Sequence, residues 1–217
     1  MISLYTAPTP NGWKASVALE EMQLEYEAHT VDLRNGEQKQ SWFTALNPNA
    51  RIPVITDHDN ADLTLFESGA IMFYLAEKTG LFLPSEPAKR YQVMQWLMFQ
   101  VGGVGPMMGQ ANVFYRYMDE TIPRAITRYQ NECRRLFEVL DKHLANHEYL
   151  VDDYSIADMA NWCWVRTYKW SGVSMDGLEH LRRWKNSIEA RPLARKGVEV
   201  PHKIIPEAVE KAGKTLI

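Results

Sequence analysis

The sequence of 217 residues lacks the features that mark several large classes of protein. No stretch approaches the ~18 to 20 consecutive apolar residues that a membrane-spanning helix requires. The formal net charge is −3, so no excess of basic residues favours nucleic acid or an anionic membrane as a partner. The first residues, MISLYTAPTP, have no basic start and no long apolar segment, and we therefore expect no secretory signal.

Cysteines and metal-ligand patterns are equally sparse. Cys133 and Cys163 cannot form a disulfide framework, and without an export signal we expect a reducing cytoplasm as the location. Both fall on apolar faces of expected helices, which favours small core residues over redox groups. His143 and His147 have the i, i+4 spacing of a chelating pair, but the Glu of a His-Glu-x-x-His motif is missing, so we expect no metal.

The residues that are present predict an α/β domain first. Hydrophobic residues make up 46% and charged residues 24%, as in ordinary globular proteins. The predicted strands cover residues 2–6, 26–33, 53–56 and 63–65, and the predicted helices cover 11–22, 38–46 and 67–79. The last two strands are too close for a helical crossover, so a thioredoxin-like N-terminal domain over residues 1–80 fits better than a doubly wound sheet.

The rest of the chain predicts helices. We expect a linker over residues 81–88 and an all-α C-terminal domain over residues 89–217, which ends in fifteen irregular residues. The predicted helices cover 89–118, 121–146, 155–168 and 178–190, the third opening with a capping box. We expect a kink at Pro106, because proline cannot donate a hydrogen bond to the carbonyl four residues earlier.

Two N-terminal motifs predict a cradle for a small peptide with an amine and carboxylates. In NPNARIPV, a cis Ile52–Pro53 bond would turn the N–H and C=O of Ile52 outward, where they can pair with an extended peptide. A trans proline that opens an ordinary strand is the alternative. In LFESGAI, Glu67 and Ser68 open a helix whose free N–H groups attract a carboxylate, while Glu67 can hold an ammonium group. Plain helix capping is the alternative there.

The loop after the first predicted strand, APTPNGWK, lacks the Cys-x-x-Cys pair that a dithiol oxidoreductase carries at this place. It holds Thr9 and Gly12 instead. The Thr9 hydroxyl and the Asn11 amide can donate hydrogen bonds to a thiolate that a ligand supplies, and with the helix dipole they lower the pKa of that thiol. Capping of the following helix by Thr9 or Asn11 is the alternative, and the two roles can coexist.

Nearly the whole chain resembles the glutathione transferase family. The resemblance rests on the ordered motifs TPNGWK, NPNARIPV, LFESGAI, YLAEKTGLF, QVGGVGPMMGQ and TIPRAITRYQ, and on the helix start SIAD. Together they are most similar to the Nu-class bacterial enzymes, relatives of the yeast nitrogen-regulator prion protein. The resemblance implies the glutathione transferase fold, a homodimer, and glutathione as co-substrate.

The resemblance also implies roles for individual residues. The family's glutathione contacts fall on Asn11, Gln38, Ile52, Pro53, Glu67, Ser68 and Arg128. The Thr9 hydroxyl matches the group near the sulfur, so Thr9 and Asn11 are the expected catalytic residues. The catalytic Tyr, Ser or Cys of other classes has no counterpart, and Tyr5, inside the first strand, is not expected to replace it.

The implied activity is glutathione-dependent reduction of disulfide bonds without a catalytic cysteine. The cradle would fix glutathione, its thiolate would attack a disulfide, and a second glutathione would resolve the mixed disulfide. Conjugation of glutathione to electrophiles in detoxification, and a non-catalytic regulatory module that binds glutathione, stay open as alternatives. Candidate walls for a second-substrate pocket, with core or dimer packing as the alternative, are Phe99, Met107, Met108, Phe114, Tyr115 and Tyr117.

Overall fold

A computed structural model describes residues 1–204 of the chain. Most of the terminal segment that the sequence predicts as irregular lies outside these residues. The described chain forms two compact units, one of Met1–Leu81 with residues 192–204, and one of Phe82–Arg191. The sequence-based division differs in assigning everything after residue 88 to the second domain.

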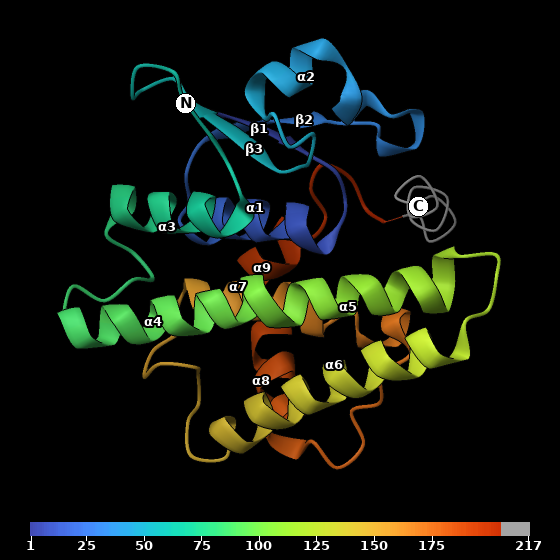
Figure 1. The fold of residues 1–217 in the computed structure, drawn as a ribbon. Helices are drawn as coiled ribbons and strands as arrows, with labels where there is room; N and C mark the ends of the chain where they lie inside the picture. Colours follow the sequence, from blue (N-terminus) through green and yellow to red (C-terminus); the bar gives the residue numbers. More distant parts are fainter. Residues whose placement is uncertain (205–217) are drawn as a thin grey trace. The chain divides into compact units, whose positions relative to one another are not determined.

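The first unit is built around a four-stranded mixed sheet (Figure 1). The strands are β1 (Ile2–Thr6), β2 (Tyr26–Thr30), β3 (Val54–Asp57) and β4 (Leu63–Phe66). Their order is β2-β1-β3-β4, with β1 parallel to β2 and antiparallel to β3, and β3 antiparallel to β4. A helix connects the parallel pair and a turn connects β3 to β4, which confirms the predicted thioredoxin-like arrangement.

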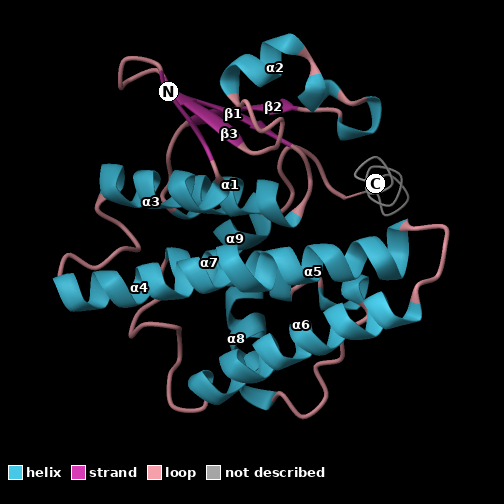
Figure 2. Cartoon of the chain, viewed as in Figure 1, coloured by secondary structure: helices cyan, strands magenta, loops and turns pink. Residues whose placement is uncertain are grey.

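Helices cover both faces of this sheet (Figure 2). α1 (Pro10–Glu21) and α3 (Ser68–Thr79) lie on one face, and α2 (Ser41–Leu46) lies on the other. Two short 3-10 turns, η1 (Leu33–Asn35) and η2 (Glu37–Lys39), precede α2. The helix predicted over residues 38–46 is thus divided between η2 and α2. Phe43 of α2 packs against Val31 and Val54, which fixes the layer that follows β2.

A last short helix, α9 (Pro192–Gly197), packs across α1 at a close approach that only glycine permits. A Cβ on Gly197 would lie 2.6 Å from the Val17 Cα. The Ser16 hydroxyl donates to the Gly197 carbonyl at 2.7 Å, and Lys196 pairs with Glu20 at 2.8 Å. α9 was not predicted; it begins at Pro192, and proline is favoured in the first turn of a helix.

The second unit is helical. Its elements are α4 (Pro87–Phe99), the π-helical η3 (Gln100–Val104), α5 (Gly105–Asn112), the π-helical η4 (Val113–Tyr117), α6 (Pro123–Leu144), α7 (Ile156–Val165), the 3-10 turn η5 (Tyr168–Ser171) and α8 (Glu179–Glu189). All of α7 is buried, so this helix is the centre of the unit. At the expected kink, η3 changes the hydrogen-bonding pattern, and Pro106 then falls in the first turn of α5, where no N–H is needed.

The predicted capping box at the start of α7 is confirmed. Asp158 accepts hydrogen bonds from the Ser155 N–H at 3.0 Å and the Ser155 hydroxyl at 3.1 Å, and Ser155 caps the helix in return. Leu150 and Trp184 donate to the other carboxylate oxygen at 2.9 and 2.8 Å. Asp158 therefore ties the start of α7 to the preceding loop and to α8.

Candidate functional site

The register of the sheet brings four chain segments to one edge. Thr6 lies opposite Thr30, Tyr5 lies opposite Val54, and Val54 lies opposite Phe66. The residues after β1, β2 and β4 and those before β3 therefore emerge side by side, because neighbouring strands are only ~4.8 Å apart. This end of the sheet is called the cradle edge. It brings together the segments that hold Thr9, Asn11, Gln38, Ile52, Pro53, Glu67 and Ser68.

Thr9 caps the N-terminus of α1. Its Oγ1 accepts a hydrogen bond from the Gly12 N–H at 3.2 Å, and its carbonyl accepts the Trp13 N–H at 2.9 Å. A hydroxyl can accept and donate at once, so this cap leaves the Thr9 proton available for an anion beside the helix start. The Gly12 backbone folds so closely onto the loop that a Cβ there would lie 2.2 Å from the Ala7 carbonyl oxygen. Asn11 is exposed in the same first turn.

Ile52 and Pro53 form the central part of the cradle edge. The bond between them is cis, as the cradle hypothesis requires. The Ile52 side chain packs against the cluster around Phe43, while its N–H and C=O make no hydrogen bond with any of residues 1–204. This backbone can therefore pair with an extended peptide, since both of its hydrogen-bonding groups need a partner.

Glu67 and Ser68 open α3 in an unusual backbone conformation. Glu67 has φ 68° and ψ 108°, a region that costs a residue with a side chain ~1–3 kcal/mol and that is found mainly at functional sites. Among residues 1–204 no side chain hydrogen-bonds the N-terminus of α3, so its first-turn N–H groups are available to a ligand carboxylate. Ser68 is 7% exposed, which leaves Glu67 as the open wall of this end.

Gln38 contributes a buried polar atom that needs a partner. It belongs to η2, is 1% exposed, and its Oε1 meets no hydrogen-bond donor among the described residues. A buried amide oxygen without a partner costs ~1–3 kcal/mol, so such atoms are rare unless a ligand or water completes them. A ligand N–H at the cradle edge would satisfy this oxygen.

Tyr5 and the two cysteines are other candidate groups, each in a packed environment. The Tyr5 ring stacks on His29 at 4.9 Å and faces Trp42 at 6.0 Å, on the side of the sheet that α2 covers. Cys133 and Cys163 are both buried in the second unit. Burial, with a smaller contribution from Glu132, raises the pKa of the Cys133 thiol to about 12, so this thiol is not a nucleophile at neutral pH.

Arg128 belongs to α6 of the second unit and is 66% exposed. Its guanidinium lies 3.6 Å from the Glu132 carboxylate, which also accepts a hydrogen bond from Arg135 at 2.6 Å. The first turns of α6 line a shallow depression formed by Pro123, Arg124, Thr127 and Arg128. Arg128 is thus a surface residue that already has a carboxylate partner.

Within residues 1–204, no three His, Cys, Asp or Glu side chains gather in a way that would hold a metal ion. In the same part of the chain, no helix combines the length and apolar character needed to cross a membrane.

Comparison with known proteins agrees with the fold. The glutathione S-transferase N-terminal domain matches residues 1–77, and the glutathione S-transferase C-terminal domain matches residues 106–192. The chain is 48% identical over 197 residues to the disulfide-bond oxidoreductase YfcG of Escherichia coli, a match that covers 88% of this chain and 92% of that protein.

Solved structures give the same result. A glutathione transferase from Pseudomonas putida with one glutathione disulfide bound per subunit has a TM-score of 0.89 and 42% identity, and covers 92% of this chain and 91% of that one. One from Burkholderia graminis with two glutathione molecules per subunit has a TM-score of 0.87 and 40% identity, covering 92% and 88%. Together with the ordered motifs of the sequence, these matches establish that the chain belongs to the glutathione S-transferase family.

Proposed function

We propose that this protein is a glutathione-dependent disulfide-bond reductase that binds glutathione at the cradle edge. The observation that carries the proposal is the Thr9 cap, which leaves a hydroxyl proton beside the start of α1 where related folds carry a cysteine. The similar oxidoreductase of Escherichia coli and the Pseudomonas putida transferase with bound glutathione disulfide support this choice of activity.

Glutathione has groups for each part of the cradle edge. Its amino-acid head carries an ammonium for Glu67 and a carboxylate for Ser68 and the first N–H groups of α3. Its peptide backbone pairs with the N–H and C=O of Ile52 beside Pro53, and one of its N–H groups donates to the buried oxygen of Gln38. Its sulfur then lies toward Thr9 and Asn11, whose donors and helix dipole stabilise the thiolate.

The chemistry is two thiol–disulfide exchanges. The glutathione thiolate attacks one sulfur of the substrate disulfide, a new S–S bond forms, and the other half leaves as a thiolate that takes a proton from water. A second glutathione thiolate attacks the mixed disulfide and releases the remaining half, which leaves glutathione disulfide. Two glutathiones are oxidised and one disulfide is reduced to two thiols, so no other electron donor is needed.

The decisive experiment measures disulfide reduction in variants that lack either the two cysteines or the Thr9 hydroxyl. The Cys133→Ala/Cys163→Ala protein should reduce dihydroxyethyl disulfide at the wild-type rate, because both thiols are buried. Thr9→Ala should lower kcat by ~100-fold, the usual effect of losing one donor to a developing or stabilised anion. Thr9→Ser keeps the hydroxyl and should restore the rate.

Absorbance of the thiolate provides a second readout for the same variants. The pKa of bound glutathione should rise in Thr9→Ala and stay low in Thr9→Ser. Loss of activity with the cysteines, or an unchanged thiolate absorbance in Thr9→Ala, would contradict the proposal. If Asn11→Ala lowered glutathione affinity and turnover by the same factor, a binding module would be the better explanation.

Conjugation of glutathione to electrophiles is the second candidate function. It is favoured by the aromatic side chains of η4, where Phe114 stacks on Tyr129 at 5.4 Å and Tyr115 is 52% exposed. Such a surface suits flat apolar substrates. Turnover of an aryl halide that exceeds turnover of a small disulfide would favour conjugation.

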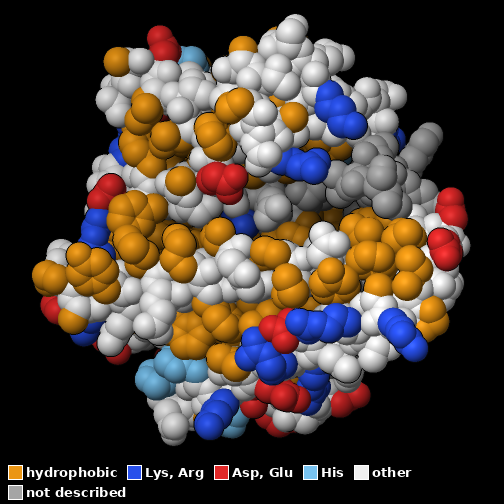
Figure 3. Space-filling view, viewed as in Figure 1, with side chains coloured by type: hydrophobic (Ala, Val, Ile, Leu, Met, Phe, Trp, Pro, Cys, Tyr) orange, Lys and Arg blue, Asp and Glu red, His pale blue; other side chains and the backbone are white. Residues whose placement is uncertain are grey.

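A homodimer and a cytoplasmic location complete the proposal. Hydrophobic side chains gather over α4 and α5 on the face drawn in Figure 3. Exposed large apolar residues include Tyr91 and Met98 of α4, and, in the first unit, Leu63 and Phe66 of β4. Exposed apolar groups of this size favour association of two copies. Light scattering at micromolar concentration tests the dimer.

A further inference from the structure

α1, whose first turn belongs to the cradle edge, is enclosed by its neighbours within the first unit. Of its 12 residues, all but Asn11 are buried. Its first turn folds closely onto the loop after β1, where a Cβ on Gly12 would lie 2.2 Å from the Ala7 carbonyl oxygen. Its middle meets α9, where a Cβ on Gly197 would lie 2.6 Å from the Val17 Cα. Backbone atoms form both contacts, so α1 cannot slide or turn unless one of them opens.

A buried hydroxyl fastens the contact between α1 and α9. Ser16 is fully buried, and its Oγ donates to the Gly197 carbonyl at 2.7 Å. Two carbonyl oxygens of its own helix lie farther away, at 3.4 Å, so the single hydroxyl proton is directed to Gly197. Lys196 of α9 also pairs with Glu20, but its side chain is 67% exposed, and a surface pair contributes at most ~1 kcal/mol. The Ser16 hydroxyl is therefore the stronger of these two polar links.

Ser16 lies one turn away from the residues that the Thr9 cap holds. Residues four apart share a helix face, so Ser16 and Gly12 are neighbours along α1. The Gly12 N–H donates to Thr9 Oγ1 at 3.2 Å, and the Trp13 N–H donates to the Thr9 carbonyl at 2.9 Å. The side-chain bond is at the long end of the normal range, so a small shift of α1 along its axis would break it. The position that Ser16 gives to α1 therefore determines the geometry of the Thr9 cap.

We propose that α9 is a positioning element for the reaction at the cradle edge, and that Ser16 and Gly197 are its positioning residues. This inference rests on the proposed function, in which the Thr9 hydroxyl and the start of α1 stabilise the glutathione thiolate. A misplacement of ~1 Å at the reacting groups can lower a rate ~100-fold, so a helix held through backbone contacts maintains the rate as well as the fold. Both residues act through α1 and not by contact with the ligand.

The rival explanation gives α9 a purely structural role. α9 follows the second unit in sequence and belongs to the first, so its contact with α1 would then only stabilise the first unit. The two explanations differ well below the melting temperature. A loss of ~1–2 kcal/mol leaves nearly all molecules folded there, so a purely structural link would change neither the rate nor the pKa of bound glutathione.

The test removes the Ser16 hydroxyl. Ser16→Ala should lower kcat for dihydroxyethyl disulfide ~5-fold or more and leave KM within ~2-fold, because it disturbs the thiolate and not the binding of the disulfide. The pKa of bound glutathione, measured from thiolate absorbance, should rise. In a Thr9→Ala background the same substitution should change kcat by at most ~2-fold, because it acts through Thr9. Ser187→Ala removes a hydroxyl that donates to a carbonyl within α8 at 2.8 Å, and it should match the wild type.

Amide hydrogen exchange without glutathione separates this inference from the proposed function. The Gly12 and Trp13 N–H groups should exchange ~5-fold or more faster in Ser16→Ala, a result that supports the positioning role even if the protein reduces no disulfide. Gly197→Ala should have a larger effect, and if that variant unfolds, Ser16→Ala still decides. Thermal melts establish that Ser16→Ala is folded at the assay temperature. Unchanged exchange overturns the proposal, as does an equal loss of kcat with Thr9 present or replaced.

Discussion

The cradle edge and the other end of the sheet, called the opposite edge here, differ in how many of their polar groups have hydrogen-bond partners. At the cradle edge, the Ile52 backbone and the Gln38 oxygen have no partner among residues 1–204, and Glu67 has a costly backbone conformation. At the opposite edge, Asp57 pairs with Lys78, and Asp59 pairs with the α-amino group of the chain. The same four strands end at both edges, so the difference lies in the residues that follow them.

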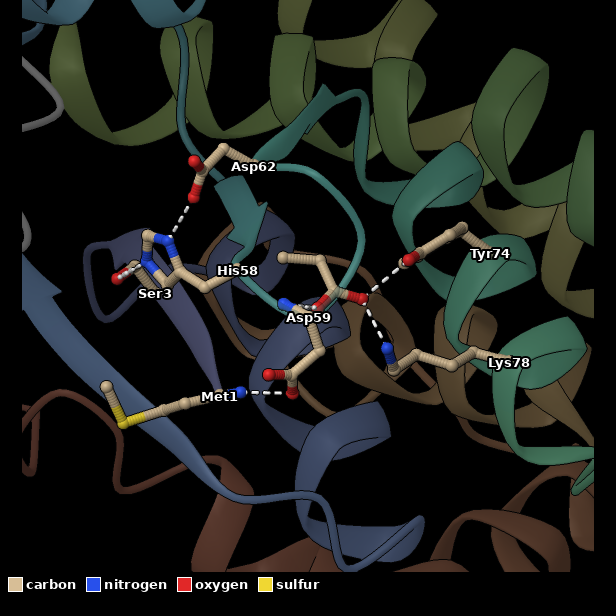
Figure 4. A network of polar contacts seen from close by, with 8 residues as sticks. Met1, Ser3, His58, Asp59, Asp62, Tyr74 and Lys78 are labelled. Carbon is tan, nitrogen blue, oxygen red and sulfur yellow. Dashed lines mark hydrogen bonds and ion pairs between the residues drawn. The ribbon is translucent and has the colours of Figure 1, made fainter.

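Figure 4 shows the polar network of the opposite edge. His58 joins the Ser3 hydroxyl at 2.9 Å and Asp62 at 2.6 Å. The α-amino group of the chain pairs with Asp59. Buried Asp57 binds Lys78 at 2.6 Å and the Tyr74 hydroxyl at 2.5 Å, which links the end of β3 to α3. The polar groups at the opposite edge stabilise the fold by pairing with one another, whereas those at the cradle edge are available to a ligand.

The largest stability effect is expected from Asp57, which anchors α3 to the sheet. Asp57→Asn should destabilise the protein by about 2 kcal/mol, because two hydrogen bonds to a buried carboxylate lose their charge. Glutathione affinity should stay within ~2-fold of the wild type, because the network lies at the far edge. Denaturant unfolding and calorimetry measure the two quantities. An affinity loss as large as the stability loss would break the division between the edges.

The stabilisation by Asp57 should depend on pH, because it requires the ionised carboxylate. Burial alone would raise the pKa of Asp57, but hydrogen bonds from Lys78 and Tyr74 outweigh it and hold the pKa below its usual range. The folded state then binds the proton more weakly than the unfolded state. The stabilisation is full above the unfolded pKa of ~4 and is lost as pH falls through the lower folded pKa. The difference in free energy of unfolding between the wild type and Asp57→Asn should therefore become smaller as the pH falls.

Gln38 should show the opposite behaviour. Gln38→Met removes a buried oxygen that lacks a partner and keeps the volume, so the free energy of unfolding should stay equal or rise by ~1 kcal/mol. Glutathione affinity should fall ~10-fold, because the ligand N–H loses its acceptor. Gln92→Met, at an exposed position of α4, should change neither quantity. A protein that loses stability with unchanged affinity would place Gln38 with the structural residues.

Local patterns predict most of the fold because they report local physics. The strands are recovered within a few residues, since apolar alternation and the flanking turns determine them. The start of α7 is predicted because Ser155 and Asp158 act within one turn. α9 is missed because its position depends on the close approach of Gly197 to α1, far away in the sequence.

The residues of the candidate site likewise differ in whether the local sequence predicts them. Thr9 and Glu67 are predicted from the sequence, since helix starts and a missing Cys-x-x-Cys pair are visible there. Gln38 is predicted only from the family resemblance, because no neighbouring residue in the sequence indicates a buried oxygen without a donor. The aromatic residues of VFYRY are predicted either as walls of a second-substrate pocket or as packing residues, because their spacing alone fits both.

The smallest effect tests whether the opposite edge has chemistry of its own. Ser3, His58 and Asp62 have the order of a nucleophile, a base and an orienting acid, with contacts of 2.9 and 2.6 Å. However, Ser3 is 5% exposed inside β1, and Asp62 is 75% exposed, where water weakens its hold on the imidazole. We expect no labelling by a serine-directed fluorophosphonate probe.

Ser3→Ala should accordingly cost at most ~0.5 kcal/mol, because the exposed His58 ring can exchange the lost hydroxyl for water. Disulfide reduction should be unchanged in this variant. Probe labelling of the wild type that disappears in Ser3→Ala would mean that both edges of the sheet are reactive. Without such labelling, the polar network at this edge serves stability, and a satisfied hydrogen-bond geometry alone does not make a catalytic site.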